Sequence, residues 1–346
     1  MRKAVALDGK GVIHVVEGPQ PEPKPGEVLV EMRASAISPG TELGGVKGRR
    51  ENPSDAPPRV FGYGNAGVVK GFGEGTEGLY ELDQPVACMG GGYAEHATWC
   101  AVPINMCVPI PTGVSFEAAA FTCLAATALH AVRRGEVVLG QHVAVFGLGP
   151  VGQFALQLAR VGGAHVLGLD RLANRLEVAT ACGAHRVVNN TTEDPVAVAA
   201  EFTRGYGLDV GILAFGGEGT AALNQAYQMM KLAPDTHRWG NIVAVGGVKV
   251  QAHLAAGLGN VDLRSSARPG PGYHDKAWEH GDHYPDVFVE WTTKRNLEEC
   301  LQFMAQKRLL VEPMITHRGP ISEAPELCEE LISRPDSAIG VILLPD

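Results

Sequence analysis

The sequence has little positive charge and no long apolar run. It contains 29 Lys and Arg residues against 38 Asp and Glu residues, which gives a net charge of −9. Nucleic-acid binding depends on clustered Lys and Arg, so this balance argues against a nucleic-acid partner. Because no apolar stretch approaches the ~20 residues that cross a bilayer, we expect no membrane partner either.

Metal-binding or redox cysteine pairs are also missing. No Cys-x-x-Cys occurs among the seven cysteines, which are Cys88, Cys100, Cys107, Cys123, Cys182, Cys300 and Cys328. An odd number of scattered thiols fits a reducing compartment better than a disulfide framework. The first residues lack the apolar core and cleavage site of a secretion signal. We therefore expect a cytoplasmic protein.

The chain is long and rich in apolar residues and glycine. Its 346 residues are 45% hydrophobic and include 44 glycines. That length exceeds a single typical core and predicts two domains. Residues 1–110 hold short apolar runs between Pro and Gly clusters, a pattern typical of a β-barrel or folded sheet. The clearest of these runs are Val12–Val16, Val28–Met32 and Val86–Cys88.

From residue 142 onward, strand-like and helix-like segments alternate. The predicted strands are His142–Phe146, His165–Asp170, Arg186–Asn189, Asp209–Phe215 and Asn241–Val245, with Val261–Leu263 as a candidate sixth. The predicted helices between them are Val151–Val161, Leu172–Ala181, Val196–Phe202 and Thr220–Leu232. Such alternation builds βαβ crossovers on a parallel sheet, so the predicted fold class is α/β with a doubly wound sheet.

The flanking segments are predicted from their caps and turns. An Ala-rich helix is expected from Ser115, a good N-cap residue, to Arg134. A long loop is expected over residues 269–285, because it opens with alternating Pro and Gly. Helices are then predicted at Asn296–Lys307 and Ser322–Ile332.

A glycine-rich turn joins the first predicted strand to the first predicted helix. It has the pattern Gly-x-Gly-x-x-Gly, formed by Gly147, Gly149 and Gly152. The first glycine permits the tight turn, the second lets a pyrophosphate approach the backbone, and the third lets helix and strand pack closely. Pro150 and Val151 stand in the first helical turn, whose partial positive charge faces the phosphates. Strand, turn and helix together predict a dinucleotide site.

The next strand ends in Asp170. A carboxylate at that point accepts hydrogen bonds from the adenosine ribose and repels a 2′-phosphate, so NAD is favoured over NADP. Arg171 and Arg175 follow it and could instead pair with a phosphate. The alternative is that both arginines are solvated at the start of a helix.

The order of these parts resembles the medium-chain dehydrogenase/reductase superfamily over essentially the whole chain. Gly26–Val30 and Val108–Pro111 match familiar segments of that superfamily, and Asp83–Val86 matches in part. The resemblance implies a GroES-like β-rich catalytic domain over residues 1–123 and 268–346. It implies a Rossmann NAD-binding domain over residues 124–267. It also implies a homodimer, because members often pair the edge strands of their Rossmann sheets.

Many members of that superfamily use a catalytic zinc. Pro39 stands in place of the first cysteine ligand and Tyr63 in place of the histidine ligand, while Cys123 alone matches. One thiolate cannot hold a zinc that needs three protein ligands. The four cysteines of the structural zinc lobe are absent as well. We therefore expect no zinc, and we expect Cys123 to be a small buried apolar residue.

Three segments narrow the resemblance to a zinc-free branch: Ser38–Glu42, Arg268–Asp275 and Trp291–Asn296. That branch includes bacteriochlorophyllide C-3 hydroxyethyl dehydrogenases and sugar- or polyol-related dehydrogenases. The implied reaction moves a hydride between nicotinamide and a secondary alcohol or ketone, on a polyol, sugar or cyclitol. The implied partner is therefore a small alcohol or carbonyl compound.

Without a metal, hydrogen-bonding groups must stabilise the alkoxide and move its proton. The candidates, in order, are Tyr63, Glu42 and Thr41. Each also has a purely structural explanation. Tyr63 could fill the volume of a lost metal, Glu42 could form an internal salt bridge, and Thr41 could stabilise a turn.

Further polar residues are candidates for binding. The substrate candidates are His96, His274, Asp275 and Arg295, with a structural turn or a solvated loop as the alternative. The additional cofactor candidates are Thr127, which resembles a position that packs on the nicotinamide, and Val245 and Gly246 at a strand end.

Two other functions fit the same segments. A quinone or enoyl reductase also lacks zinc, although such relatives usually prefer NADPH, against which Asp170 argues. A non-catalytic NAD(P)-binding sensor is the alternative from another class.

Overall fold

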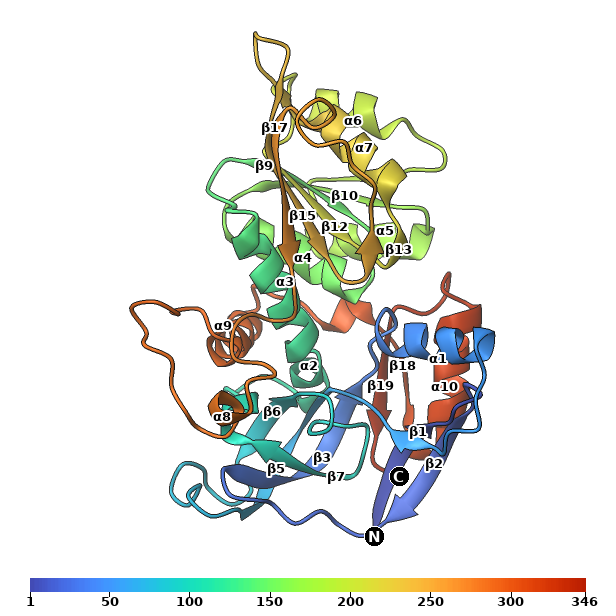
Figure 1. Cartoon of the computed structure of the whole chain (residues 1–346), viewed down its shortest axis with the longest axis vertical. Coiled ribbons are helices and arrows are strands. Elements are labelled where there is room, and N and C mark those ends of the chain that lie inside the picture. Colours follow the sequence, from blue (N-terminus) through green and yellow to red (C-terminus); the bar gives the residue numbers. More distant parts are fainter. The chain divides into compact units, whose positions relative to one another are not determined.

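The computed structural model describes the whole chain, residues 1–346, as two compact units (Figure 1). The first unit contains residues 1–126, 269–307 and 314–346. The second contains residues 127–268 and 308–313. The first boundary lies within helix α3 (Thr122–Arg134), three residues beyond the expected position of 123, and residues 308–313 join the second unit.

The second unit is built on a parallel sheet with the strand order β11-β10-β9-β12-β15-β17. These strands are β9 (His142–Phe146), β10 (His165–Asp170), β11 (Arg186–Asn189), β12 (Val210–Ala214), β15 (Arg238–Val245) and β17 (Asn260–Ser266). The short strand β14 (Lys231–Leu232) adds an antiparallel partner to β15. The order reverses beside β9, which is the usual position of a nucleotide site in such sheets. The predicted α/β doubly wound fold is confirmed.

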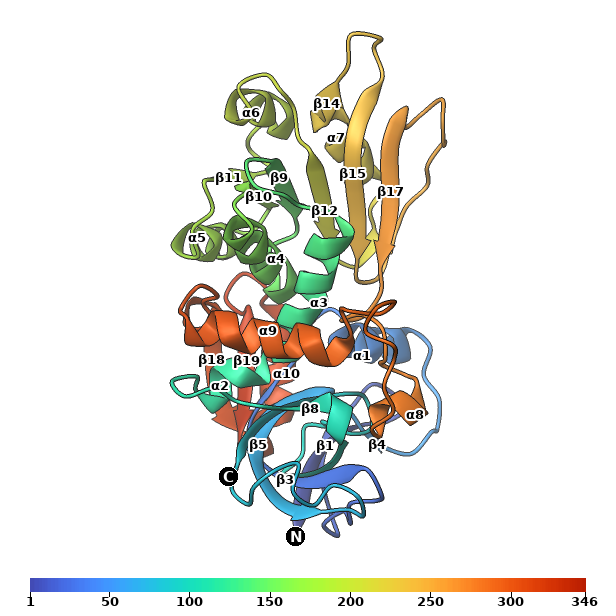
Figure 2. The same ribbon diagram turned by 90° about the vertical axis from the view of Figure 1, so that its left-hand side faces the viewer.

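Four helices connect these strands: α4 (Pro150–Val161), α5 (Ala173–Ala181), α6 (Pro195–Phe202) and α7 (Thr220–Met229). Figure 2 shows α4, α5 and α6 beside the sheet. The apolar faces of α6 and α7 join Phe146, Leu167 and Leu213 in one buried core. The strands read as continuous apolar runs because both faces of a parallel sheet are covered.

The expected long helix before the sheet is two helices, α2 (Phe116–Ala120) and α3. Ser115 caps α2 as predicted, and its side chain accepts a hydrogen bond from the Ala118 N–H. The expected helix α7 ends at Met229 rather than residue 232, because the next residues pair with β15 as β14. These are boundary corrections that leave the topology unchanged.

The first unit is a β-rich fold with two sheets, as the GroES-like prediction requires. Its larger sheet has the order β18-β19-β3-β5-β6-β8, with β7 also on β3, and the smaller has the order β2-β1-β4. The strands are β1 (Arg2–Leu7), β2 (Ile13–Gly18), β3 (Glu27–Ala36), β4 (Arg59–Val60), β5 (Gly64–Phe72), β6 (Pro85–Met89), β7 (Trp99–Pro103), β8 (Cys107–Pro109), β18 (Ile315–Pro320) and β19 (Gly340–Leu344). Because β19 pairs with β3, the C-terminal segment completes the N-terminal sheet.

Two helices cover an apolar cluster in this unit: α1 (Glu42–Glu51) and α10 (Ala324–Ser333). The sequence of α1 contains three glycines, each of which disfavours a helix by about 1 kcal/mol, so propensity alone does not predict it. Burial of Leu43 and Val46 against the cluster stabilises α1 instead. This packing places Glu42 in the first helical turn, inside the unit.

The predicted loop over residues 269–285 contains a short helix, α8 (Lys276–Glu279), before α9 (Thr293–Ala305). Asp275 caps α8 by accepting hydrogen bonds from the Ala277 and Trp278 N–H groups. No helix in the structure is both long and apolar enough to cross a bilayer.

Three histidines form a ladder across neighbouring strands of the second unit. His142 and His165 stack with ring centroids 5.2 Å apart, and His165 meets His185 edge-on at 5.4 Å. Asp209, Lys231, Arg204 and Arg160 are the charged groups around them. Burial lowers the pKa of His142 and of His185, and repulsion from His165 adds to both shifts.

This ladder predicts a loss of stability in acid. The folded pKa of His142 and of His185 lies below the ordinary value of 6.5, so the unfolded chain takes up protons first as the pH falls. Stability from this source is complete above 6.5 and is lost below it. We expect the wild-type Tm to fall more between about pH 7.5 and about pH 5.5 than that of His142→Gln/His185→Gln, by about 2–4 °C. His253→Gln, an exposed histidine of the same unit, is the control, and equal pH dependence in all three proteins would contradict the prediction.

Candidate functional site

The glycine turn after β9 has the backbone that the dinucleotide motif requires. Gly147 has a left-handed φ of +86°, which other residues rarely adopt. A Cβ on Gly152 would lie 1.9 Å from the Gly147 carbonyl oxygen, so only glycine fits there. A Cβ on Gly149 would meet nothing within 4 Å, and this residue is the N-cap of α4. The open space beside Gly149 suits a phosphate that approaches the backbone.

Asp170 ends β10 with its carboxylate turned toward this glycine turn. Its Oδ2 accepts a hydrogen bond from the Leu148 N–H at 2.7 Å. Its Oδ1 accepts from the N–H groups of Arg171 at 2.8 Å and Leu172 at 3.0 Å. A carboxylate has about four acceptor positions, so these three bonds leave one for a ribose hydroxyl. The same bonds hold the carboxylate in place.

The remaining cofactor candidates also lie in the second unit. Arg171 is exposed. Arg175 lies 3.6 Å from Asp170, measured between Nη1 and Oδ2, and its Nε is buried without a hydrogen-bond partner. Val245 ends β15, and Gly246 follows it with a φ of +88°. Thr127 lies on α3, where the second unit begins.

The first unit gathers a polar cluster around Tyr63. The Tyr63 hydroxyl donates a hydrogen bond to Ser38 Oγ. The Thr41 hydroxyl also hydrogen-bonds to the phenol, and the Glu42 carboxylate lies close enough to act on it electrostatically. Burial raises the pKa of Tyr63 well above its ordinary value, and the charge of Glu42 raises it further. All three predicted catalytic side chains therefore lie together, and the phenol is held in its neutral form.

Glu42 is almost completely buried, with 9% of its surface exposed. Its Oε2 accepts a hydrogen bond from the Ser38 N–H at 2.7 Å and lies 3.0 Å from His96 Nε2. Its Oε1 is buried without a partner. Glu42 is therefore an internal member of the cluster, which connects Tyr63 and Ser38 to His96.

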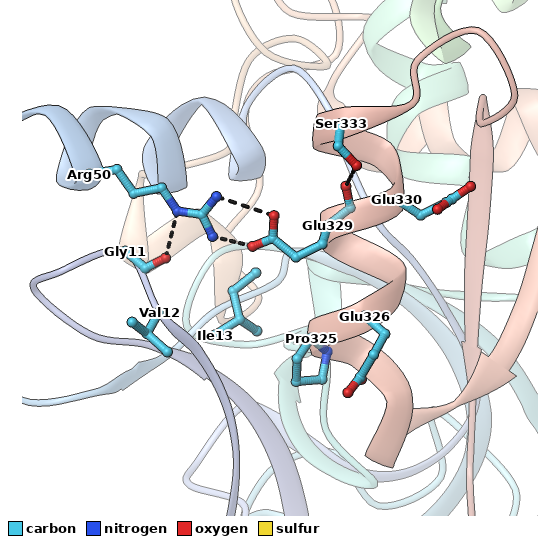
Figure 3. A pocket seen from close by; sticks show the side chains of 9 residues that line it. All are labelled: Gly11, Val12, Ile13, Arg50, Pro325, Glu326, Glu329, Glu330 and Ser333. Atoms are coloured by element: carbon cyan, nitrogen blue, oxygen red, sulfur yellow. Dashed lines mark hydrogen bonds and ion pairs between the residues drawn. The ribbon is translucent and has the colours of Figure 1, made fainter.

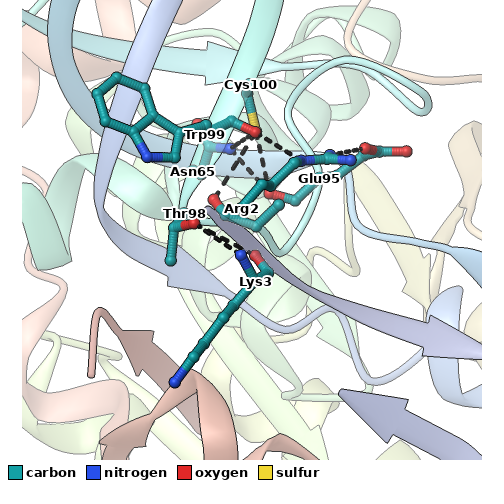
Figure 4. A network of polar contacts seen from close by, with 8 residues as sticks. Arg2, Lys3, Asn65, Glu95, Thr98, Trp99 and Cys100 are labelled. Carbon is teal, nitrogen blue, oxygen red and sulfur yellow. Dashed lines mark hydrogen bonds and ion pairs between the residues drawn. The ribbon is translucent and has the colours of Figure 1, made fainter. Parts of the chain in front are cut away.

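His96 has no exposed surface, and both of its ring nitrogens are engaged, by Ser35 and by Glu42. This corrects the expectation that His96 contacts substrate, because no substrate atom can reach a fully buried ring. Figure 4 shows the contacts around the neighbouring segment: Arg2 pairs with Glu95, and Asn65 donates a hydrogen bond to the Glu95 carbonyl at 2.9 Å.

The residues around Tyr63 do not fit a catalytic zinc. Burial, with a further contribution from Glu42, raises the pKa of the Cys123 thiol to about 12, which disfavours the thiolate that zinc requires. Glu42 offers one free oxygen, and His96 offers no free nitrogen. No group of three or more His, Cys, Asp or Glu side chains in the chain is arranged to hold a metal. A zinc with three protein ligands has no place here.

The loop after residue 268 is anchored to the same part of the first unit. Tyr273 Oη accepts a hydrogen bond from the Gly91 N–H at 2.8 Å, and the adjacent Gly90 N–H donates to the Tyr63 carbonyl at 3.0 Å. His274 stacks on Tyr273 with ring centroids 3.9 Å apart and remains exposed. Its left-handed φ of +78° marks a backbone conformation that is costly for histidine. His274 therefore stays a candidate for substrate contact.

Two other substrate candidates, Asp275 and Arg295, contact residues near them in the sequence. Asp275 caps α8 and also accepts a hydrogen bond from Tyr284 Oη at 2.6 Å. Arg295 stacks on Trp291, with its guanidinium carbon 4.1 Å from the ring centre, and pairs with Glu290 at 2.7 Å. These contacts give Asp275 and Arg295 structural roles, and their contact with substrate stays a prediction.

A hollow of about 450 Å³ lies apart from this cluster, between β2, α1 and α10 (Figure 3). Arg50 and Glu329 form an ion pair across it, and Arg50 Nε donates a hydrogen bond to the Gly11 carbonyl. Two further glutamates, Glu326 and Glu330, line it. The one cation is neutralised, so nothing in this hollow is arranged to bind an anionic or carbonyl ligand.

Sequence reasoning missed Ser35, Ser38 and the internal role of His96. Ser38 lies in the quoted segment Ser38–Glu42, yet only the fold turns its hydroxyl toward Tyr63. Ser35 lies on β3, some sixty positions from its partner His96, and no local pattern links them.

Comparison with known proteins agrees with this architecture. The sequence pattern of the family described as "Zinc-binding dehydrogenase" matches residues 150–279. This range excludes Tyr63, Glu42 and Cys123, so the match does not bear on metal ligands. Human sorbitol dehydrogenase is 27% identical, over 94% of this chain and 91% of its own length. An uncharacterised zinc-type alcohol dehydrogenase-like protein of Escherichia coli is 26% identical, over 93% of each chain.

Solved structures agree over the full length. An alcohol dehydrogenase from Thermus sp. ATN1 has a TM-score of 0.79 at 25% identity, covering 99% of this chain and 100% of its own. An Escherichia coli oxidoreductase of unknown specificity has a TM-score of 0.82 at 19% identity, covering 100% of this chain and 99% of its own. The latter likeness concerns the fold alone.

A dinucleotide turn on a doubly wound sheet, joined to a GroES-like unit, defines an NAD(P)-binding oxidoreductase of the alcohol dehydrogenase type. The chain is similar to members of the zinc-type medium-chain dehydrogenase/reductase superfamily.

The glycine turn gives a paired prediction. Gly152→Ala should lower the Tm and abolish NADH binding, because its Cβ collides with the Gly147 carbonyl. Gly149→Ala should leave the Tm unchanged but weaken NADH binding roughly tenfold or more, because its Cβ occupies the phosphate approach. Thermal melting and NADH fluorescence titration separate the two effects. Wild-type NADH affinity in Gly149→Ala would rule out the assigned phosphate position.

Proposed function

We propose that this protein is a zinc-independent, NAD-dependent dehydrogenase that interconverts a secondary alcohol and a ketone, on a polyol, sugar or cyclitol. The observation that carries the proposal is the Tyr63 cluster. A phenol, two hydroxyls and a carboxylate lie together where the superfamily resemblance expects metal ligands. This cluster offers acid–base chemistry in place of a Lewis acid.

The proposed chemistry needs a proton at oxygen and a hydride at carbon. When bound to the second unit, the nicotinamide supplies or accepts the hydride. In the reducing direction, Tyr63 donates its proton to the substrate oxygen as the carbonyl becomes an alkoxide. The raised pKa of Tyr63 keeps the phenol protonated until the substrate oxygen takes up its proton. Hydrogen bonds between the phenol and the Ser38 and Thr41 hydroxyls lower the pKa of Tyr63. Once the Tyr63 proton has left, both hydroxyls can turn to donate to the phenolate.

The substrate class rests on relatives and on the hydrogen-bonding groups present. The curated relatives include sorbitol dehydrogenases, and the similar structures include one titled galactitol-1-phosphate dehydrogenase and one titled 2R,3R-butanediol dehydrogenase. Thr41 and His274 are exposed in the first unit and can bond to neighbouring hydroxyls of a polyol. A substrate with adjacent hydroxyl groups uses these donors and acceptors better than a simple alcohol does.

NAD is proposed over NADP on the position of Asp170. Its carboxylate is fixed by three backbone N–H groups and keeps one acceptor position open. A 2′-phosphate at the same place would meet a negative charge. One similar structure carries NADP in its title, so the preference is a property to be measured on this chain.

Calorimetry should therefore find NADH bound at least about tenfold more tightly than NADPH. Asp170→Ser should reduce this difference, because it removes both the ribose acceptor and the repulsion. Glu177→Gln, which changes an exposed residue of α5, is the matched control and should leave NADH affinity unchanged. Tighter binding of NADPH to the wild-type protein would remove Asp170 from its proposed role.

Tyr63→Phe tests the catalytic proposal. With sorbitol, 2,3-butanediol and their ketone products assayed by NADH absorbance, the variant should lose about 10²-fold in kcat with NADH affinity intact. Tyr206→Phe, which alters an exposed phenol of the second unit, should match the wild type. Unchanged turnover in Tyr63→Phe would leave Tyr63 with a packing role only.

The same assay tests metal independence. Protein dialysed against a chelator should keep its turnover, and metal analysis should find well under one zinc per chain. Turnover that depends on one bound zinc would contradict the proposal. Reduction of quinones or enones alone would favour the quinone or enoyl reductase, and no turnover with any compound would favour an NAD(P)-binding sensor.

A further inference from the structure

Three buried polar side chains near Tyr63 contact one another in series. Ser35 comes from β3, His96 from the segment before β7, and Glu42 from the start of α1. Ser35 and His96 have no exposed surface, and Glu42 has 9%. Side chains of this kind are rarely buried unless their charges and hydrogen bonds are matched, so their protonation is constrained by their neighbours.

The hydroxyl hydrogen of Ser35 is used in a hydrogen bond to the Gly64 carbonyl. Ser35 Oγ lies 2.9 Å from the Gly64 carbonyl oxygen and 2.6 Å from His96 Nδ1. A carbonyl oxygen can only accept, and a serine hydroxyl has one hydrogen, so that hydrogen points to Gly64. The contact with His96 must then use a ring hydrogen. Nδ1 of His96 carries a proton and donates it to Ser35.

The opposite nitrogen of His96 faces Glu42, with 3.0 Å between Nε2 and Oε2. With Nδ1 already protonated, this contact also needs one proton between the two groups. Either the imidazolium donates to the carboxylate, or a carboxylic acid donates to the neutral ring. The pair holds that proton in both cases and carries no net charge.

A bare Glu42 carboxylate would act directly on the groups around it. Its Oε1 is buried without a partner, and an unbalanced negative charge on Glu42 raises the pKa of three neighbours: Tyr63, Cys123 and Cys328 from α10. His96 is the side chain within hydrogen-bond distance of this carboxylate that can supply a proton to balance its charge. The Ser38 N–H donates to the same Oε2 and adds a fixed dipole, not a charge.

The backbone of His96 is hydrogen-bonded on both sides, which fixes the position from which its ring extends. The His96 N–H donates to the Phe61 carbonyl at 3.0 Å, and its carbonyl accepts from the Val5 N–H at 2.9 Å. Figure 4 shows Arg2 bridging Glu95 and the Trp99 carbonyl, which brackets the segment that carries His96. The ring of Phe61 meets the His96 ring edge-on at 5.4 Å.

The order Ser-His-Glu invites comparison with a nucleophilic triad. In a triad, the serine hydroxyl gives its hydrogen to the histidine and faces substrate. Ser35 does the reverse, because it accepts from His96, donates to Gly64 and has no exposed surface. Acyl transfer is therefore excluded. The contact from Ser35 orients His96, and His96 in turn contacts Glu42.

We propose that His96, oriented by Ser35, is the positioning residue of this site, and that the proton it shares with Glu42 keeps the carboxylate beside Tyr63 fixed and neutralised. This rests on the proposed function of Tyr63 as proton donor. Without His96, Glu42 faces the phenol as an unpaired charge and opposes formation of the phenolate. The donor then becomes weaker, although the cofactor site in the second unit is untouched.

The proton assignment is tested without any substrate. In protein labelled with ¹⁵N at histidine, the His96 signals are identified by their absence in His96→Gln. We expect Nδ1 to be protonated near neutral pH and the Nε2 signal to shift in Glu42→Gln. If His96→Gln does not fold, Ser35→Ala identifies the same signals, because it shifts the resonance of His96 Nδ1. An Nδ1 without a proton overturns the proposal.

The effect on Tyr63 is tested by a double-mutant cycle on the polyol with the highest turnover. His96→Gln should lower kcat at least about tenfold with NADH affinity unchanged, and Glu42→Gln alone should cost less. The combined variant should return to the Glu42→Gln level, because no charge is left to neutralise. A merely structural His96 predicts that the two losses multiply, and that result overturns the proposal.

His14→Gln is the matched control. His14 also faces a carboxylate at 3.0 Å, from Nε2 to Oδ2 of Asp8, but lies outside the cluster, and its variant should keep the wild-type kcat. If no polyol turns over, the proposed function fails while the NMR result still decides the proton assignment. Intact turnover with an unprotonated Nδ1 refutes the positioning role alone.

Discussion

A buried carboxylate is the constraint around which the first unit is organised. Glu42 is placed inside the unit because α1 packs Leu43 and Val46 on the apolar cluster. Removing one partner of a buried ion pair typically costs about 3–5 kcal/mol, so such a carboxylate requires its donors. The Ser38 N–H and His96 provide them, and Tyr63 is positioned against the same group.

The two units divide the chemistry between them. The second unit offers a helix N-terminus, a glycine turn and a fixed carboxylate, which are fixed partial charges and space suited to a dinucleotide. The first unit offers a neutral phenol supported by hydroxyls, which suits proton transfer. The buried Cys123 thiol, with its raised pKa, is poorly suited to hold a metal.

The second unit was predictable because its signals are local. Alternating strand and helix patterns and the Gly147–Gly152 turn act within a few residues, so the strands β9, β10 and β11 were predicted to their ends. The first unit was predicted only as a class. Helix α1 contains three glycines and depends on distant packing, and α8 needs the cap from Asp275 inside a Pro- and Gly-rich loop.

The sequence by itself determined the α/β fold class, the glycine turn and the residue types at the positions where the resemblance expects metal ligands. Tertiary structure alone decided which of the polar candidates meet. It buried His96, and it gave Asp275 and Arg295 hydrogen-bond partners close to them in the sequence. It also brought Ser35, on β3, against His96. The physical reason is range: turn and strand patterns depend on neighbouring residues, whereas hydrogen-bond partners of buried side chains depend on which strands the fold sets side by side.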